Sequence, residues 1–284
     1  LTPIRLLESG PAGGALAVSS LSRSNNNSNC IAFDMGGTTA KICLLKDLKP
    51  GKATEFEFGR VHQNKPGSGI KVKVPSIHML EIGAGGGSIA EVDELGLLKI
   101  GPESAGSDPG PICYGQGGKN VTITDVNLLL GYLSTDKLLA GHLELNYLRT
   151  SEIVDSTARK HNYPTDEFLT GIRKVVNENM SQAIKLHVTE LGEDHRQSIL
   201  YAFGGAGPLH AYDICKKLQI SSFIVPNLAG ILSAYGFLTS HISIEKNFSY
   251  ISLLDTISLN ELNSFIDQCK RQTYNSLDLS LIHI

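Results

Sequence analysis

The chain has 284 residues, of which 41% are hydrophobic and 19% are charged, and its formal net charge is -3. This length and apolar content are enough to bury a large core, in one large domain or two smaller ones. The slightly acidic balance and the lack of a basic run argue against nucleic acid and against an anionic membrane surface as partners.

The first predicted element is a glycine-containing turn that leads into a short apolar helix. Three glycines fall between Leu6 and Gly14, and the residues from Ala15 to Leu21 are mostly apolar. Ser9 is a residue type that caps helices, so a capped helix start and a ligand contact are both open here. The polar run from Ser22 to Asn29 predicts an exposed loop.

Residues 30–46 predict a β-hairpin with a phosphate-binding tip, because two apolar runs flank a glycine turn. The tip consists of Asp34, Met35, Gly36, Gly37, Thr38 and Thr39. The two glycines lack a Cβ, which lets an anion approach the backbone, and successive N–H groups in such a turn form an anion-binding nest. The two threonines add hydroxyl donors, and the aspartate is our candidate for holding Mg²⁺, directly or through water. A tight turn without a ligand is the alternative.

Three further strands precede a second glycine cluster, and a turn separates the first two of them. The strands are predicted at Thr54–Val61, Lys71–Val74 and Ile77–Ile82, with the turn at Asn64–Gly69. The cluster from Gly83 to Ser88 resembles a dinucleotide fingerprint, but the residues from Ile89 to Ile100 predict a hairpin turning near Gly96. A Rossmann site needs a helix at that place, so we exclude it. His78 and Glu81 lie on the strand before the cluster. They are candidates for acid/base groups or metal ligands, and a purely structural role is the alternative.

The region from Gly101 to Gly118 is rich in glycine and proline and predicts an irregular, functional segment. After it the period becomes helical. Thr124 or Asp125 is a candidate cap for the next helix, and Asp125 is alternatively a catalytic group facing the glycine clusters. Helices are predicted at Val126–Leu133, Ser151–His161, Thr165–Leu191, Leu209–Leu218, Ala229–Leu238 and Leu259–Tyr274. Strands are predicted at Ser198–Phe203, Phe223–Val225 and Phe248–Leu253.

A strand, a glycine turn and a helix follow one another between Ser198 and Leu218. The turn contains Gly204, Gly205 and Gly207, and Pro208 suits the first turn of the helix. Such a unit is a ready anion or nucleotide contact, although close packing of a strand on a helix also selects glycine. With the early hairpin, it predicts an α/β fold in which helices flank a mixed sheet, as in an actin-like ATPase domain.

The five cysteines are scattered and form no CxxC pair. Several lie in apolar runs, so we expect buried thiols in a reducing compartment, and hence a cytoplasmic protein. Zinc is not supported. The sequence contains no membrane-spanning stretch and no visible signal peptide.

Six motifs occur in order along the chain. They are Ser9–Gly14, Asp34–Thr39, Ile82–Ala90, Gly110–Gly115, Thr124–Asp125 and Phe203–Ala211. Together they resemble the hydantoinase A / 5-oxoprolinase family, which includes N-methylhydantoinase A and acetone carboxylase beta-like proteins. The resemblance covers residues 1–245, with an inserted glycine-rich segment at 62–120, and leaves 246–284 as the start of a truncated C-terminal segment.

This resemblance implies an actin/hexokinase/Hsp70-like ATPase fold of the ribonuclease H-like type. Asp34–Thr39 would be the second phosphate loop, and the turn with Gly204, Gly205 and Gly207 would be the adenosine-side loop. Asp34, His78 and Asp125 would be the catalytic candidates, with ATP and Mg²⁺ as cofactors. The family carries another phosphate loop in a preceding domain, and no such segment is present here.

The family's chemistry is the ATP-dependent opening of a cyclic amide such as a hydantoin or 5-oxoproline. Phosphorylation of the carbonyl oxygen makes a leaving group, and this transfer needs positioned donors and Mg²⁺. A hydantoinase B-like companion subunit or domain is the expected partner, and a homo-oligomer is also open. Lys41, where members often have aspartate, and the lack of an aspartate near His78 leave a ketone carboxylase subunit as an alternative. A nucleotide-binding domain without turnover is the other alternative.

Overall fold

The structure is a computed structural model, and it describes residues 6, 8–24, 28–58, 69–135, 143–241, 244 and 246–281. The chain divides into two compact units, residues 1–239 and 240–284. The predicted turn at 64–69 and the end of the strand predicted at 54–61 lie largely outside the described residues. The predicted domain division at residue 245 stays a prediction.

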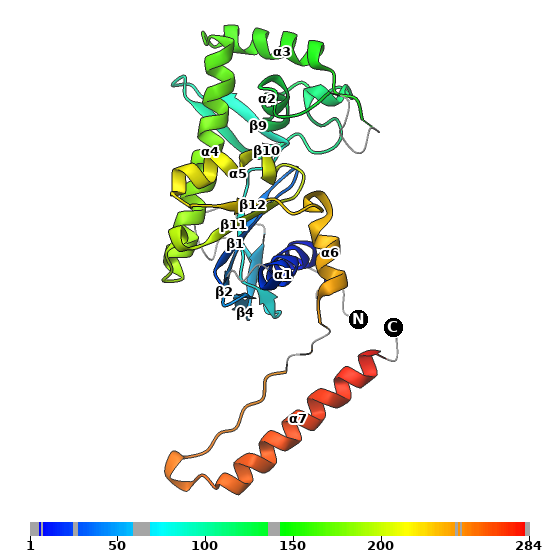
Figure 1. Cartoon of the computed structure of the whole chain (residues 1–284), viewed down its shortest axis with the longest axis vertical. Coiled ribbons are helices and arrows are strands. Elements are labelled where there is room, and N and C mark those ends of the chain that lie inside the picture. Colours follow the sequence, from blue (N-terminus) through cyan, green and yellow to red (C-terminus); the bar gives the residue numbers. More distant parts are fainter. Residues whose placement is uncertain are drawn as a thin grey trace. The chain divides into compact units, whose positions relative to one another are not determined.

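A mixed sheet forms the centre of the first unit (Figure 1). Its strand order is β12-β11-β1-β2-β3, and β8 also pairs with β2. The bounds are β1 Cys30–Met35, β2 Ala40–Lys46, β3 Lys49–Pro50, β8 Leu80–Ile82, β11 Ile199–Phe203 and β12 Phe223–Ile224. β1 runs parallel to β11 and antiparallel to β2, so the predicted early hairpin and the later strand meet side by side.

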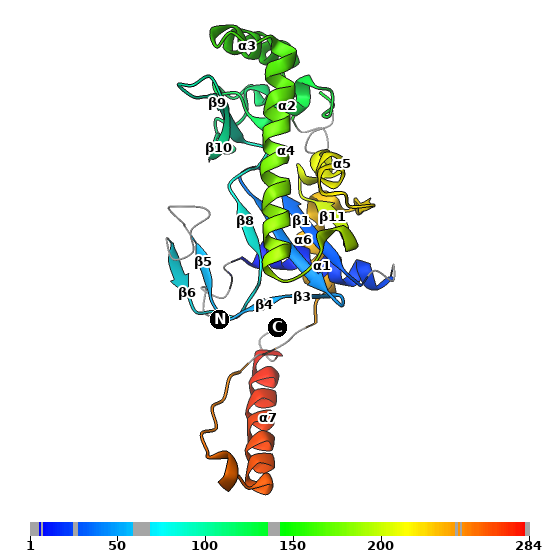
Figure 2. The ribbon, with the colours of Figure 1, turned by 90° about the vertical axis from the view of Figure 1, so that its left-hand side faces the viewer.

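Helices cover both faces of this sheet because its central strands alternate between two apolar cores. Ile31 and Phe33 of β1 face one core, which contains helices α4 (Thr165–Glu190) and α5 (Gly207–Leu218). Cys30 and Ala32 face the other core, which contains α1 (Ser9–Ser24) and α6 (Leu232–Thr239). Figure 2 shows α4 crossing in front of the main sheet. The predicted apolar stripe of α4 is therefore confirmed as core.

The glycine turn predicted before a short first helix is wrong, because these glycines lie inside α1, where that helix packs on α6. α1 begins at Ser9 and contains the glycines of that motif. A Cβ on Gly236 of α6 would lie 1.7 Å from the carbonyl oxygen of Gly13, and a Cβ on Gly14 would lie 2.4 Å from the Phe203 ring. Close packing of α1 on α6 therefore accounts for Gly13 and Gly236, and close packing of α1 on β11 accounts for Gly14.

The first unit contains further strands and helices. They are β4 Lys52–Ala53, β5 Phe56–Phe58, β6 Ile70–Val72, β7 Ser76–Ile77, β9 Ser88–Val92, β10 Leu98–Ser104, α2 Ile123–Leu129, α3 Tyr147–Lys160 and the 3-10 helices Ile112–Tyr114, His195–Gln197 and Ala229–Ile231. β9 and β10 form the predicted hairpin, whose turn is closed by an N–H of Gly96 that donates to Asp93. Four of the five cysteines are buried and all five are free thiols.

The second unit contains α7 (Leu259–Leu281) and the 3-10 helix Leu254–Thr256. The strand predicted at Phe248–Leu253 is wrong, since this segment has no regular structure and no pairing strand among the described residues. Tyr250 of this segment packs on the helix instead, with its ring 5.0 Å from the Phe265 ring. No helix in the described ranges of either unit is long and apolar enough to cross a membrane.

Candidate functional site

Two of the predicted glycine turns leave the same edge of the main sheet. β1 and β11 are parallel, with Asp34 opposite Phe203 in the register, so the turns that follow them lie together. The N–H of Ala206 donates to the carbonyl oxygen of Met35 at 2.9 Å. Ligands of open α/β sheets bind at the carboxyl ends of parallel strands, which makes this edge the candidate site.

Gly204 holds the two turns in contact. Its φ of +81° lies in the left-handed region, and a Cβ there would be 2.4 Å from the Met35 carbonyl oxygen and 2.5 Å from Asp34 Oδ1. Any other residue would be strained and would push the Asp34 carboxylate away. The fold itself therefore requires this glycine, and the requirement brings Asp34 against the second turn.

Gly37 and Gly205 are glycines that the fold does not require. Both are exposed, a Cβ on either would meet no atom within 4 Å, and neither has a φ in the left-handed region. A ligand that approaches the backbone closely gives a reason for glycine at such positions. The two open glycines thus form a cradle that side chains would fill, one in each turn.

The third glycine turn is a buried brace beneath the hairpin tip. The N–H groups of Gly86 and Gly87 donate to the carbonyl oxygens of Gly36 and Gly37, at 2.9 and 2.6 Å. In a planar trans peptide the N–H points away from the carbonyl. Because both carbonyls point into the brace, the N–H groups of Gly37 and Thr38 point away from it, and both residues are exposed, as an anion-binding nest requires.

Asp34 lies at the edge of this cradle, opposite Lys41 in the β1–β2 pairing. Burial raises the pKa of the Asp34 carboxyl above its ordinary value, and the nearby Lys41 ammonium partly offsets that shift. Lys41 Nζ is itself paired with Glu8 at 2.6 Å and with Glu81 at 3.4 Å. Within the described ranges, no three His, Cys, Asp or Glu side chains form a group that could hold a metal. One carboxylate fits Mg²⁺, which is commonly held by one or two carboxylates, phosphates and water.

Asp125 is an acceptor for four buried donors of its own neighbourhood. Its carboxylate accepts the N–H groups of Ile112, Cys113 and Thr122 and the Thr122 hydroxyl. Thr122 is the N-cap of α2, and Asp125 is its partner in a capping box. The prediction that Thr124 or Asp125 is the cap residue is therefore wrong, because the N-cap is Thr122, and Asp125 takes part in the capping as its third-position partner. The geometry gives the catalytic hypothesis for Asp125 no support, and that role stays a prediction.

His78 lies at the other end of β2 from the tip. Its N–H donates to Gly51, in the connection after β3, whereas β2 meets β8 near the tip at Ala40 and Ile82. The His78 ring stacks on His187 of α4, with centroids 5.2 Å apart. Burial and the neighbouring His78 lower the pKa of His187 to about 4. The structure therefore brings Asp34 to the two turns and places His78 elsewhere, so its catalytic role also stays a prediction.

A group of polar side chains under α5, all buried except the half-buried Asp213, was missed by sequence reasoning. It contains Asn127, Arg173, Asn177, His210 and Asp213. Arg173 and Asn177 occur four residues apart beside the apolar stripe of α4, where polar residues have to find partners. That spacing was the signal that could have revealed them.

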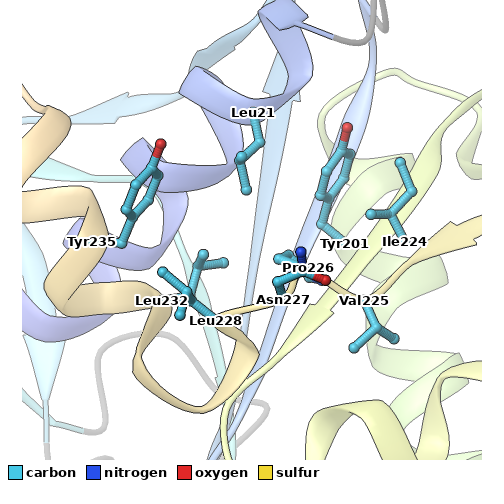
Figure 3. Close-up of a pocket in the computed structure, with 9 residues that line it drawn as sticks. All are labelled: Leu21, Tyr201, Ile224, Val225, Pro226, Asn227, Leu228, Leu232 and Tyr235. Carbon is cyan, nitrogen blue, oxygen red and sulfur yellow. The ribbon is translucent and has the colours of Figure 1, made fainter.

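An apolar pocket of about 390 Å³ lies on the face of the sheet that α1 and α6 cover (Figure 3). Its lining includes Leu21, Tyr201, Leu232 and Tyr235. It contains none of the turn residues, so the cradle and this pocket are separate features.

Comparison with known proteins finds a family model and several relatives that match this chain. Residues 1–246 match the family model described as hydantoinase/oxoprolinase. Caprolactamase subunit alpha of Pseudomonas jessenii is 32% identical over 277 residues, 96% of this chain and 38% of that protein. The 5-oxoprolinase of Saccharomyces cerevisiae is 34% identical over 256 residues, 86% of this chain and 19% of that protein. The chain thus spans well under half the length of these relatives.

Solved structures agree with these matches. The crystal structure of the ATP-dependent caprolactamase from Pseudomonas jessenii aligns with a TM-score of 0.74 at 30% identity, over 94% of this chain and 38% of that one. Nucleotide-free acetone carboxylase aligns with a TM-score of 0.71 at 25% identity, over 80% of this chain and 31% of that one. The predicted actin/hexokinase-like ATPase fold, with its mixed sheet between helices, is confirmed.

Proposed function

Because the chain belongs to the hydantoinase/oxoprolinase family, we propose that it is the ATP-binding part of an ATP-dependent hydrolase that opens a cyclic amide. The observation that carries the proposal is the pair of open glycines, Gly37 and Gly205, in two turns that leave the same edge of the sheet. The fold needs no glycine at either position, whereas a nucleotide lying against the backbone of both turns does. A relative named an ATP-dependent caprolactamase supports both the cofactor and the cyclic amide.

The residues of the site divide the work by position. The outward N–H groups of Gly37 and Thr38 would hold phosphate oxygens, and Gly205 would leave room for the nucleotide at the start of α5. Asp34 would hold Mg²⁺ or its water at the edge of the cradle. Bound Mg-ATP would supply the phosphoryl group that turns the amide oxygen into a leaving group. This step needs no side chain that forms a covalent intermediate with the phosphoryl group.

The amide substrate and its attacking water are assigned to a companion. The caprolactamase relative is named a subunit alpha, which supports a further subunit or domain beside this one. His78 and Asp125 remain candidates for the acid/base groups only if that companion reaches them. Five free thiols are consistent with a cytoplasmic location, which we also propose.

A ketone carboxylase subunit is the second candidate, and the alignment with acetone carboxylase favours it. Both candidates use the same nucleotide cradle and differ in what accepts the phosphoryl group. ATP hydrolysis stimulated by a lactam would support the first, and hydrolysis stimulated by a ketone with bicarbonate would support the second. Nucleotide binding without phosphate release under either condition would support a binding domain without turnover.

The decisive experiment compares alanine variants of three glycines. Gly37→Ala and Gly205→Ala add a methyl group to the cradle, and Gly51→Ala adds one at the far end of the sheet, where it would only touch His78 Cβ at 3.4 Å. Mg-ATP at about 100 times its dissociation constant stabilises by about 2.7 kcal/mol, which is about 5 to 10 °C for a unit of this size.

We expect that shift in the wild type and in Gly51→Ala, and its loss in the two cradle variants. The melting temperatures without nucleotide should agree among all four proteins, because none of the methyl groups meets a close atom. A full shift in Gly37→Ala and in Gly205→Ala would contradict the proposed site.

A further inference from the structure

A buried polar network lies directly behind the second turn, under the start of α5. At its centre is His210, which is 0% exposed, with Asn127 of α2 and Asn177 of α4 at 0% and 2%. His210 Nδ1 lies 2.6 Å from Asn177 Oδ1, and His210 Nε2 lies 3.2 Å from Asn127 Nδ2. One imidazole therefore joins three helices.

Two charged groups fix the direction of each hydrogen bond in this network. Arg173 donates to Asn127 Oδ1 at 2.7 Å, which leaves the Asn127 Nδ2 group to donate to His210 Nε2. Asn177 Nδ2 donates to Asp213 Oδ2 at 2.9 Å, which leaves Asn177 Oδ1 to accept from His210 Nδ1–H. Only the neutral Nδ1–H tautomer satisfies both neighbours. Burial and the Arg173 charge lower the pKa of His210 to about 3, so the ring is neutral at pH 7.

The network closes a ring of contacts that runs through both turns. On the α2 side, the N–H and hydroxyl of Thr124 donate to the carbonyl of Gly86, whose own N–H donates to Gly36 of the hairpin tip. On the α5 side, Arg173 donates to the Leu209 carbonyl at 2.6 Å, and the second turn binds back to β1 through Ala206 and Met35. His210 links α2 to α5 directly through Asn127, and Arg173 of α4 bridges the same two helices through Asn127 and Leu209.

We propose that His210 is a positioning residue that sets the separation between the hairpin tip and the β11–α5 turn, so that one nucleotide engages both. This inference rests on the proposed function. Two contacts on a rigid scaffold reinforce each other through a high effective concentration. If the scaffold loosens, each contact keeps its own affinity, but a ligand that spans both loses the reinforcement.

The test therefore compares a spanning ligand with its parts. The dissociation constants of Mg-ATP, Mg-pyrophosphate and adenosine are measured by calorimetry on the full chain. His210→Phe removes both hydrogen bonds at similar volume, whereas His210→Gln keeps an acceptor for Asn127. His187→Phe is the matched control, because His187 is also a buried imidazole, 3% exposed, but stacks on His78.

We expect His210→Phe to weaken Mg-ATP at least tenfold and to leave Mg-pyrophosphate and adenosine within twofold. His210→Gln should recover most of the Mg-ATP affinity, and His187→Phe should bind like the wild type. A purely structural role would weaken all three ligands together, in parallel with the melting temperature, and that result overturns the inference, as does unchanged Mg-ATP binding in His210→Phe.

A second variant covers the case in which His210→Phe does not fold. Asn127→Ala removes the α2 end of the same link and should give the same selective loss of Mg-ATP affinity. Wild-type affinity in Asn127→Ala would overturn the inference. If the wild type itself binds no Mg-ATP, the proposed function fails, and this outcome is distinct from a defect confined to the network variants.

Discussion

Replacing Asp125 will destabilise the first unit far more than it changes nucleotide binding. The carboxylate is fully buried and accepts the N–H groups of Ile112, Cys113 and Thr122 at 3.3, 2.8 and 2.9 Å, and the Thr122 hydroxyl at 2.7 Å. In Asp125→Ala the hydroxyl can rotate to another partner, but three buried N–H groups lose their acceptor. Each such loss costs about 1 to 3 kcal/mol.

The two short bonds at about 2 kcal/mol each and the long one at about 1 kcal/mol give a loss of about 5 kcal/mol. This is a third or more of the total stability of a typical domain, which is about 5 to 15 kcal/mol. Asp125→Asn keeps one acceptor oxygen and replaces the other with an NH₂ group. In the orientation that loses fewer hydrogen bonds, the NH₂ group faces only the N–H of Cys113. Its expected loss is therefore smaller, about 2 kcal/mol.

Urea unfolding followed by circular dichroism measures both losses, and Mg-ATP affinity is measured on the folded Asp125→Asn protein. We expect the order wild type, Asn, Ala in stability and an unchanged nucleotide affinity in the Asn variant. The reasoning is refuted if Asp125→Ala lies within about 1 kcal/mol of the wild type, below the penalty for a single buried donor. An Asn variant of native stability that has lost ATP turnover would instead restore the catalytic hypothesis.

Three other predictions concern charge and packing. The pKa values of His187 and His210, at about 4 and about 3, lie below the unfolded value of 6.5, so their stabilisation is complete above pH 6.5 and is lost as the pH falls. Each of the two histidines should lower the free energy of unfolding by about 2 kcal/mol between pH 6.5 and pH 5. A urea midpoint that does not fall over this range would contradict the prediction. Lys41→Met removes the cation that lowers the pKa of Asp34, so that pKa should rise further in a carbon-13 NMR titration, and an unchanged value would show that the charge does not matter. Gly236→Ala puts a methyl group 1.7 Å from a backbone oxygen of α1 and should lower stability by about 3 kcal/mol in urea unfolding, whereas a stable variant would mean that the helices separate easily.

Elements with a strong local signal were predictable from the sequence. The 26-residue α4 follows a continuous apolar stripe, and the hairpin of β1 and β2 follows two apolar runs around a glycine turn. The strand predicted at Phe248–Leu253 had a similar alternation but finds no pairing strand among the described residues. Alternation describes one strand, whereas a sheet needs a second, and the second is not a local property.

The functions of the glycines were not predictable, because the same residue answers different physical demands. Gly13 and Gly236 allow two helices to touch, and Gly86 lies buried in the brace. Gly37 and Gly205 have open space instead. Most of them stand in similar glycine clusters in the sequence. Only the atoms that a Cβ would meet separate the glycines that the fold requires from the two that it does not.

The buried groups that support the two turns affect ligand binding in two different ways. The brace turns the Gly36 and Gly37 carbonyls inward, which sends the next two N–H groups outward, so that the orientation of the tip depends on Gly86 and Gly87. The spacing of the tip from the second turn depends on the link through His210. Orientation affects every anion that binds the tip, whereas spacing affects only a ligand long enough to reach both turns. A loss shared by pyrophosphate and ATP therefore identifies a fault in the brace, and a loss confined to ATP identifies a fault in the network.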